Sequence, residues 1–328
     1  MNSPLDVQPF HPGLTPEWDR FVAASRNGTF QFDRGYMDYH ADRFQDCSLV
    51  VRRGAEIVAL LPANRREGQL VSHAGLSYGG MIVGSTMTTP LMLDCFAACL
   101  GWMAAAGIRS WHYKSMPTIY HRHPADEDRY ALFRAGAALV RRDVLSVLDL
   151  GDHPPFQERR RRGGRKAANA GLRAGPSTDW AGFWHLLESR LSDRYDLRPV
   201  HSVGEMTMLA RRFPEQIRLY TAQGPAGEML AGTVIYDTGP VLHAQYIAAS
   251  DDGMRNGALD LLFTELFGSV FAGRHWFDFG NSNERQGRYL NVGLIEFKEG
   301  FGARAVSQDY YEMAVDVAQR ALASWREQ

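Results

Sequence analysis

The segment His275–Tyr311, HWFDFGNSNERQGRYLNVGLIEFKEGFGARAVSQDYY, decides the fold. Its first residues, 276–279, alternate and are aromatic, which predicts a buried strand that Gly280 ends. A polar loop follows, and an apolar stripe at helical spacing then runs to Phe297, before Gly300 and Gly302. A strand, a polar loop, a short helix and a Gly-rich exit are typical of the carboxyl edge of an α/β sheet, where ligands bind.

The rest of the chain repeats one order of predicted elements twice. Three strands, a helix and a strand are expected at 48–52, 57–64, 70–72, 90–106 and 108–113, and again at 217–222, 229–236, 241–248, 256–272 and 275–279. His73-Ala74 and His243-Ala244 fall at matching places, and so do Trp111 and Trp276. We therefore expect two copies of one α/β unit. The alternative is a chance likeness between two ordinary α/β segments.

The terminal segment also carries a family resemblance. Asp278-Phe279-Gly280, Gly293-Leu294, Phe297-Lys298 and Phe301-Gly302 resemble the C-terminal signature of the Fem-type branch of the GNAT acyltransferases. That branch includes the peptidoglycan FemAB aminoacyltransferases and FemAB-like N-acyltransferases associated with polysaccharide synthesis. The likeness covers the second half of the chain better than the first. It implies an α/β fold of two tandem GNAT-like domains, with mixed central sheets flanked by helices and an inter-domain cleft.

Composition agrees with two cytoplasmic domains. The chain has 328 residues, 45% hydrophobic and 22% charged, which suits domains at 1–150 and 151–328. The net charge of −1 gives no general attraction to nucleic acid or membrane. Three cysteines without CxxC spacing, and a start that lacks the features of a signal peptide, predict a reducing cytoplasm. The longest apolar run, 91–108, contains Asp94 and predicts a core helix rather than a membrane span. The oligomeric state stays open.

A basic connector, 156–173, separates the two repeats. It carries seven cationic residues, which are Arg159, Arg160, Arg161, Arg162, Arg165, Lys166 and Arg173. Such a run is either a solvated face, a site for the phosphates of CoA or of a nucleotide-linked sugar, or, as the resemblance implies, a site for a tRNA acceptor arm. It lacks the interleaved aromatic residues that stack on single-stranded bases.

The resemblance implies where an acyl donor binds. GNAT-type transfer needs a strand that splays to expose backbone N–H groups, a helix N-terminus for the pyrophosphate of acyl-CoA, and a proton acceptor. The strand, turn and helix at 246–258 have the right order, although the usual Q/R-x-x-G-x-G/A spacing is not met. The alternative is an ordinary strand-to-helix turn. The candidate donor-binding residues are Ile247, Ala248, Gly253, Arg255, Asn256, Gly257, Arg162 and Lys166.

The candidate catalytic residues are His243, Tyr246, Asp278 and Lys298. Strand alternation predicts that His243 and Gln245 share one side and Tyr246 the other. His243 is either a base that accepts the amine proton or a core histidine whose hydrogen bonds are made within the protein. Asp278 stands between aromatic residues, so it needs a partner or a site. Lys298 forms an ion pair, binds an anionic acceptor or stabilises an oxyanion.

Polar residues also predict the acceptor side. They are His73 and Tyr78 in the first repeat, and Asn281, Ser282 and Glu284 after the last strand. We expect the later three and Lys298 to face the inter-domain cleft. No zinc spacing, HExxH, Walker loop, Rossmann fingerprint or GxSxG is present, so we expect no metal site and no serine hydrolase.

Together these features predict an N-acyltransferase that moves an acyl group from acyl-CoA, with acetyl-CoA as the expected donor, to a small-molecule amine. An amino sugar or a polysaccharide or cell-envelope precursor is the expected acceptor. One alternative is Fem-type transfer from aminoacyl-tRNA, which the lack of a long heptad run disfavours. The other is a non-catalytic, degenerate GNAT pair that only binds a ligand.

Overall fold

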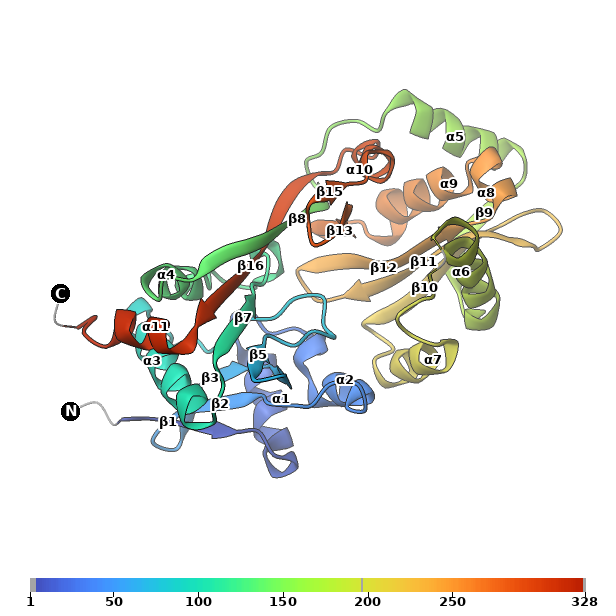
Figure 1. Ribbon diagram of the computed structural model, residues 1–328. Helices are drawn as coiled ribbons and strands as arrows, with labels where there is room; N and C mark the ends of the chain where they lie inside the picture. The colour runs from blue at the N-terminus through green and yellow to red at the C-terminus, as the bar shows by residue number, and fades with distance from the viewer. Residues whose placement is uncertain (1–3, 196, 327–328) are drawn as a thin grey trace. The chain divides into compact units, whose positions relative to one another are not determined.

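The computed structural model describes residues 4–195 and 197–326 (Figure 1). The chain divides into two compact units. Unit 1 combines Met1–Asp143 with Ser307–Gln328, and unit 2 is Val144–Val306. Two long strands, β8 (Ala138–Asp149) and β16 (Arg304–Ala314), carry the chain from one unit into the other. We expected a division near residue 150, and the structure adds that the end of the chain groups with unit 1.

Unit 1 contains two small sheets. One has the strand order β1-β2-β3-β6 and is antiparallel, and the other has the order β4-β5-β7-β16, in which β5 and β7 are parallel. The strands are β1 (Leu5–Pro9), β2 (Leu49–Arg53), β3 (Glu56–Leu61), β4 (Asn64–Arg66), β5 (Gln69–Val71), β6 (Ile82–Val83) and β7 (Ser110–Lys114). The helices are α1 (Thr15–Ala24), α2 (Arg34–Met37), α3 (Thr89–Ala105), α4 (Glu127–Arg134) and α11 (Val315–Leu322).

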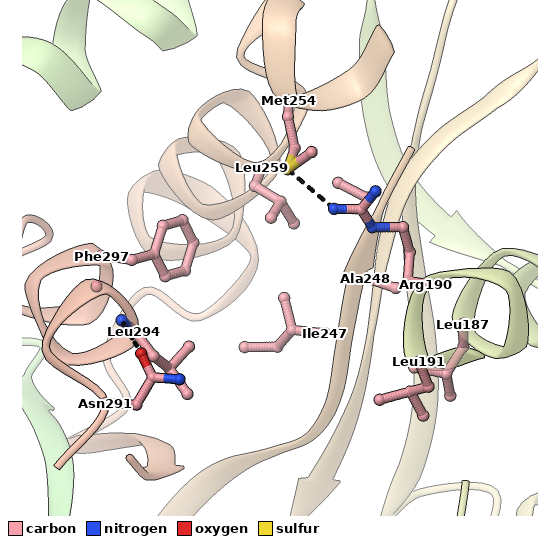
Figure 2. Close-up of a pocket in the computed structure, with 12 residues that line it drawn as sticks. Leu187, Arg190, Leu191, Ile247, Ala248, Met254, Leu259, Asn291, Leu294 and Phe297 are labelled. Carbon is pink, nitrogen blue, oxygen red and sulfur yellow. Dashed lines mark hydrogen bonds between the residues drawn. The ribbon is translucent and has the colours of Figure 1, made fainter. Parts of the chain in front are cut away.

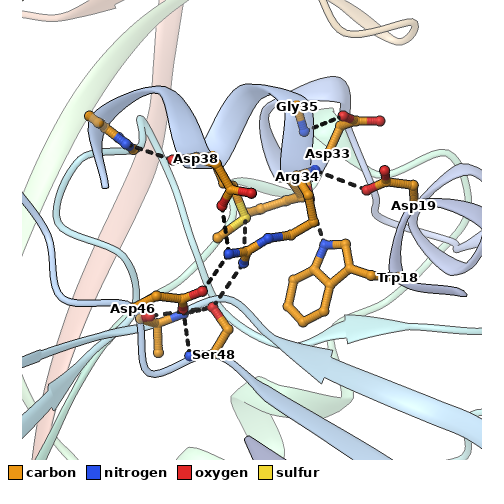
Figure 3. A network of polar contacts seen from close by, with 12 residues as sticks. Trp18, Asp19, Asp33, Arg34, Gly35, Asp38, Asp46 and Ser48 are labelled. Carbon is orange, nitrogen blue, oxygen red and sulfur yellow. Dashed lines mark hydrogen bonds and ion pairs between the residues drawn. The ribbon is translucent and has the colours of Figure 1, made fainter. Parts of the chain in front are cut away.

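The core of unit 1 lies around α3. Buried α3 side chains pack on the sheets, as when the ring of Phe96 lies 4.9 Å from that of Trp111. The segment between α1 and β2 is fixed by a buried cation (Figure 3). The Arg34 guanidinium lies 3.7 Å above the Phe10 ring and donates to the carboxylates of Asp38 and Asp46. A buried charge with two partners and an aromatic face is satisfied, so we regard Arg34 as structural.

Unit 2 is one twisted sheet with helices on its faces. Its strand order is β8-β13-β12-β11-β10-β9, with β12 and β13 parallel. The strands are β9 (Arg173–Ser177), β10 (Ile217–Gln223), β11 (Met229–Asp237), β12 (Val241–Ala249), β13 (Trp276–Asn281) and a small hairpin of β14 (Asn283–Glu284) and β15 (Tyr289–Leu290). The helices are α5 (Glu158–Asn169), α6 (Trp180–Tyr195), α7 (Val203–Arg212), α8 (Asp251–Asn256), α9 (Ala258–Glu265) and α10 (Val292–Glu299).

The core of unit 2 is aromatic. The rings of five phenylalanines from α9, the turn after it, β13 and the turn before β16 contact one another; they are Phe263, Phe267, Phe277, Phe279 and Phe301. Four of them belong to the buried cluster that joins α9 to the sheet, and Phe267 packs against it. The cluster therefore holds α9 against β13.

The two units share the expected order of elements, and each has a parallel strand pair that includes its last predicted strand, β7 or β13. β2 and β3 are antiparallel like β10 and β11, and β5–β7 is parallel like β12–β13. The third strand differs, because β11 pairs with β12 whereas β3 pairs with β6, and β4 and β5 form a separate hairpin. The single strand predicted at 57–64 is thus split into β3 and β4.

The helix predicted at 256–272 is interrupted. Gly257 adopts a φ of +74°, which ends α8 and begins α9. A side chain at this position would meet the backbone, since a Cβ would lie 2.4 Å from the carbonyl oxygen of Gly163 in α5. The close approach of α5 to the α8–α9 junction therefore requires glycine here.

Candidate active site

The parallel pair at the centre of unit 2 opens along its length. β12 pairs with β13 from Val241 to His243, whose partner is Asp278, and no pairing with β13 follows in the described chain although β12 continues to Ala249. On its other side β12 stays paired with β11, except at a bulge that leaves Gln245 unpaired. Backbone groups of β12 beyond His243 therefore face the opening, as GNAT-type transfer requires.

A cavity of about 450 Å³ lies at this opening (Figure 2). Its wall comes from four places: the end of β12, α6, the α8–α9 region and α10. The lining is mostly apolar; it comprises Leu187, Arg190, Leu191, Ile247, Ala248, Ala249, Met254, Leu259, Asn291, Gly293, Leu294 and Phe297. This volume and composition are typical of a ligand site.

The two polar side chains of the cavity are held in place. Arg190 forms an ion pair with Asp251 at 2.6 Å and contacts the sulfur of Met254. Asn291 accepts a hydrogen bond from the Leu294 N–H at 3.1 Å, which caps α10. Neither side chain was predicted as a site residue. The Asn that precedes an apolar helical stripe was a visible N-cap signal, but nothing in the sequence tied it to β12.

His243 and Asp278 come together across the parallel strands. The distance between His243 Nδ1 and Asp278 Oδ2 is 3.1 Å, and the carboxylate is almost fully buried. Asp278 also accepts a hydrogen bond from the Gly280 N–H at 2.7 Å. A carboxylate opposite Nδ1 favours the tautomer with the proton on Nδ1, so Nε2 is the basic nitrogen. This dyad has the arrangement of a base with its orienting partner.

Lys298 lies beside the same strand end. Its ammonium donates to the carbonyl oxygens of Gly280 at 2.9 Å and Asn281 at 2.6 Å. Only 3% of the residue is exposed. This burial lowers the pKa of Lys298 to about 8, while the charge of Asp278 opposes the shift. Since Phe297 lines the cavity, α10 connects this buried cation to the cavity wall.

Tyr246 is placed apart from the dyad. Its hydroxyl lies 2.6 Å from His201 Nδ1, and its ring packs against Trp184 on α6. Burial raises the pKa of Tyr246 to about 12. The bulge at Gln245 also breaks the strict alternation predicted for this strand, so residues beyond it change phase relative to His243. A catalytic role for Tyr246 stays a prediction.

The turn into α8 is acidic and capped by its own side chain. Ser250 Oγ accepts the Gly253 N–H at 2.9 Å, and Asp251 and Asp252 occupy the first turn. α8 has six residues and ends at Gly257. Of the predicted donor-binding residues, Ile247 and Ala248 line the cavity, and Gly253, Arg255 and Asn256 lie in this short helix. The role of this turn in binding the donor phosphates stays a prediction.

The basic connector is mostly a helix. α5 packs on α9, and Lys166 donates to the carbonyl oxygen of Arg255 at 2.7 Å, at the end of α8. Arg162 points to solvent. The two predicted residues of the connector thus belong to α5, one of them in contact with α8.

The predicted acceptor-side residues fall in two places. Asn281, Ser282 and Glu284 follow β13, and Glu284 accepts a hydrogen bond from Asn291 at 3.0 Å. His73 and Tyr78 belong to unit 1 and are buried there. His73 stacks on His40 with 5.1 Å between the rings, and Tyr78 donates to Thr29 at 3.0 Å. Their role in binding an acceptor stays a prediction.

Within the described residues, no group of three His, Cys, Asp or Glu side chains is arranged to hold a metal ion. Over the same part of the chain, no helix is long and apolar enough to cross a membrane.

Comparison with known proteins identifies the second unit. Residues 156–298 match the family of acetyltransferase (GNAT) domains. Curated protein sequences yield no match. The crystal structure of FemX has a TM-score of 0.66 at 12% identity, over 98% of this chain and 100% of that one.

Two further structures share the fold. The C-terminal domain of a putative lysylphosphatidylglycerol synthetase from Agrobacterium fabrum has a TM-score of 0.60 at 14% identity, over 94% of both chains. A tandem GNAT protein from the clavulanic acid biosynthesis pathway has a TM-score of 0.51 at 14% identity, over 95% of this chain and 98% of that one. At these identities the likeness is one of fold.

Proposed function

We propose that unit 2, in which residues 156–298 match the family of acetyltransferase (GNAT) domains, moves an acyl group from acyl-CoA to the amino group of a small molecule. The observation that carries this proposal is the opening of β12 from β13 onto an apolar cavity. An apolar space beside unpaired strand backbone suits a pantetheine arm, which adds amide groups along an otherwise apolar chain.

The residues around the opening would each have a different role in the reaction. His243 Nε2 takes the proton of the attacking amine, and Asp278 holds the ring and stabilises the imidazolium. The carbon–nitrogen bond forms, the carbon–sulfur bond breaks, and the proton passes to the leaving thiolate. Backbone N–H groups of β12 beyond His243 and the Lys298 ammonium stabilise the negative charge on the carbonyl oxygen.

The acceptor is proposed from the resemblance. An amino sugar or a polysaccharide or cell-envelope precursor fits an N-acyltransferase of this branch, and the chemistry would take place in the cytoplasm. Asn281, Ser282 and Glu284 would contact the acceptor, because they follow β13 directly and stand next to the His243–Asp278 dyad along the chain.

The test is release of free CoA from acetyl-CoA and longer acyl-CoA thioesters in the presence of a panel of amines. We expect turnover with at least one amino sugar, and a rise in the KM for acyl-CoA when Ala248→Trp fills the cavity. The control is Ala104→Trp on the exposed side of α3 in unit 1, which leaves the cavity unchanged. Binding of acyl-CoA without turnover for any amine would instead support a non-catalytic ligand-binding protein.

A second candidate is transfer from aminoacyl-tRNA. The exposed arginines of α5, Arg161, Arg162 and Arg165, favour it, since cationic side chains neutralise the phosphates of a nucleic acid. Titration of tRNA at several salt concentrations separates the two donors. Each phosphate that the protein neutralises steepens the log–log salt slope by roughly 0.7–0.9. A slope of about four or more, with aminoacyl transfer, would replace the acyl-CoA proposal.

A further inference from the structure

Helix α5 has two different faces. One packs against α9, with Gly164 and Ala167 buried and the backbone of Gly163 against Gly257. The other carries three arginines whose side chains are 55%, 71% and 68% exposed, Arg161, Arg162 and Arg165. All three share one carboxylate, that of Glu158. The buried face holds the helix, so this excess of positive charge is available to a partner.

Helix α5 lies alongside α9 (Figure 1), and its side chains contact two elements that wall the cavity. Near the start of α5, Arg159 donates to the carbonyl oxygen of Glu296 in α10 at 2.8 Å. Near its end, Lys166 donates to the carbonyl oxygen of Arg255 in α8 at 2.7 Å. Both α8 and α10 contribute to the cavity lining. A partner docked on α5 therefore sits beside the structure that receives the acyl arm.

The end of the cavity near α8 does not suit a nucleotide diphosphate. Ser250 uses the Gly253 N–H, and two carboxylates stand in the first turn. Arg190 and Arg255 are paired with Asp251 and Asp252 respectively. CoA brings a pyrophosphate and a further phosphate to this place. The same pantetheine arm attached to a protein brings one phosphodiester.

We propose that the donor is a small acidic carrier protein that presents the acyl group on a phosphopantetheine arm. The exposed arginines of α5 bind its acidic surface, and the apolar cavity takes the arm. This inference rests on the proposed acyl transfer and names the carrier of the thioester. A tRNA fits the same charge less well, because Phe297 is the one aromatic residue among the described residues that line the cavity, whereas single-stranded nucleotides bind by stacking.

Three donors with the same octanoyl group test the proposal: a bacterial acyl carrier protein, CoA and pantetheine. The variant is Arg161→Glu, Arg162→Glu and Arg165→Glu together. We expect kcat/KM with the carrier to fall by about 10- to 100-fold, since reversed charges repel an acidic partner and slow its association. The values with octanoyl-CoA and octanoyl-pantetheine should stay within about twofold, because neither needs the docking face. Mass spectrometry of the thiol product follows all three reactions.

The matched control reverses three other exposed arginines, with Arg211→Glu, Arg218→Glu and Arg320→Glu. It changes net charge equally and should leave the carrier reaction unchanged. Turnover with pantetheine also proves that each variant is folded. A carrier reaction no faster than that of CoA, or an equal loss with all donors, overturns the carrier inference alone. No turnover with any thioester, or aminoacyl transfer from tRNA, overturns the acyl-CoA proposal as well.

Discussion

Each unit contains one parallel strand pair with the same kind of pairing, but what lies beyond the pair differs between the units. β5 and β7 run parallel with Leu70 opposite Trp111, and β12 and β13 run parallel with Leu242 opposite Phe277. In unit 2 the strands open onto the cavity. In unit 1 the chain beyond β5, residues 72–80, is largely buried against its own unit. The same strand pair thus holds a site in one unit and a packed loop in the other.

The lysines show the same contrast. The chain has only three, Lys114, Lys166 and Lys298, among 36 cationic residues. Lys114 donates to the carbonyl oxygens of Leu76 at 2.5 Å and His73 at 3.5 Å, and burial lowers its pKa to about 8, as it does for Lys298. A buried lysine with a low pKa is therefore no mark of catalysis by itself. The neighbours of such a lysine decide whether it is catalytic, and of the two buried lysines only Lys298 lies beside the His243–Asp278 pair.

Replacing each buried lysine in turn is the most direct test of the difference between the two units. We expect Lys298→Met to lower kcat by about 10²- to 10³-fold, the usual cost of losing one oxyanion donor. Lys114→Met should leave kcat within a few-fold. Both variants remove a buried ammonium that donates to two carbonyl oxygens, so each should lose about 1–3 kcal/mol of stability. Steady-state kinetics and urea unfolding measure both effects, and equal losses of kcat would end the distinction.

His73 and His243, which the sequence repeat matched, give the next test, although the strand pairing puts Val71 at the position of His243. His243→Ala should lower kcat by about 100-fold through loss of the base, with partial rescue by added imidazole. His73 has its pKa lowered to about 3, chiefly by burial, so it stays neutral near pH 7 and has no proton to exchange. His73→Gln should therefore reduce stability with little change in kcat. Imidazole rescue of the His73 variant would contradict this assignment.

The pH profile separates charge stabilisation from base catalysis at Lys298. Its pKa is about 8 in the folded protein, against an ordinary value of 10.5 for a lysine in water. If the ammonium stabilises the oxyanion, activity falls by up to tenfold per pH unit above about 8. The folded state also binds fewer protons than the unfolded state between these values, so stability rises with pH from about 8 to 10.5. Activity that rises through pH 8 would make the neutral lysine a base.

Much of the decisive segment was predictable from local patterns. The strand at 276–279 is β13, and the apolar stripe ending at Phe297 lies in α10. Asp278 was expected to need a partner, and His243 provides it. Ser202 and Glu205 also have the sequence spacing of a capping box, and they form one at the start of α7. Local signals suffice here because capping and burial depend on neighbours in sequence.

Features set by distant contacts were not predictable. The bulge at Gln245 depends on the pairing of β12 with β11, and the break at Gly257 depends on contact with α5. The return of the C-terminal segment to unit 1 depends on pairing between Tyr311 and Tyr113. Gly163 and Gly164 lie within α5, and their small size lets this helix pack closely on α9.

The smallest effect on activity is expected at Tyr113, which occupies in β7 the place that Phe279 occupies in β13. Phe279 packs among aromatic rings, whereas the Tyr113 hydroxyl donates to Asp128 at 2.6 Å and accepts from the Met81 N–H at 2.7 Å. Tyr113→Phe removes the hydrogen bonds to both partners and should cost about 1–3 kcal/mol, with kcat unchanged below the melting temperature.

The pH dependence of the stability lost in Tyr113→Phe shows which hydrogen bond accounts for the loss. Burial raises the pKa of Asp128 from 3.8 to about 6, and the hydrogen bond from Tyr113 opposes that rise. The folded state therefore binds more protons than the unfolded state between these values, and stability falls as pH rises through them. Without the hydroxyl the pKa of Asp128 rises further, so the fall is larger. Tyr113→Phe should be more destabilising at pH 7 than at pH 4 in urea unfolding.

The exposed Tyr130, whose hydroxyl accepts from Arg134, is the control. A loss equal at both pH values would assign it to the Met81 N–H alone.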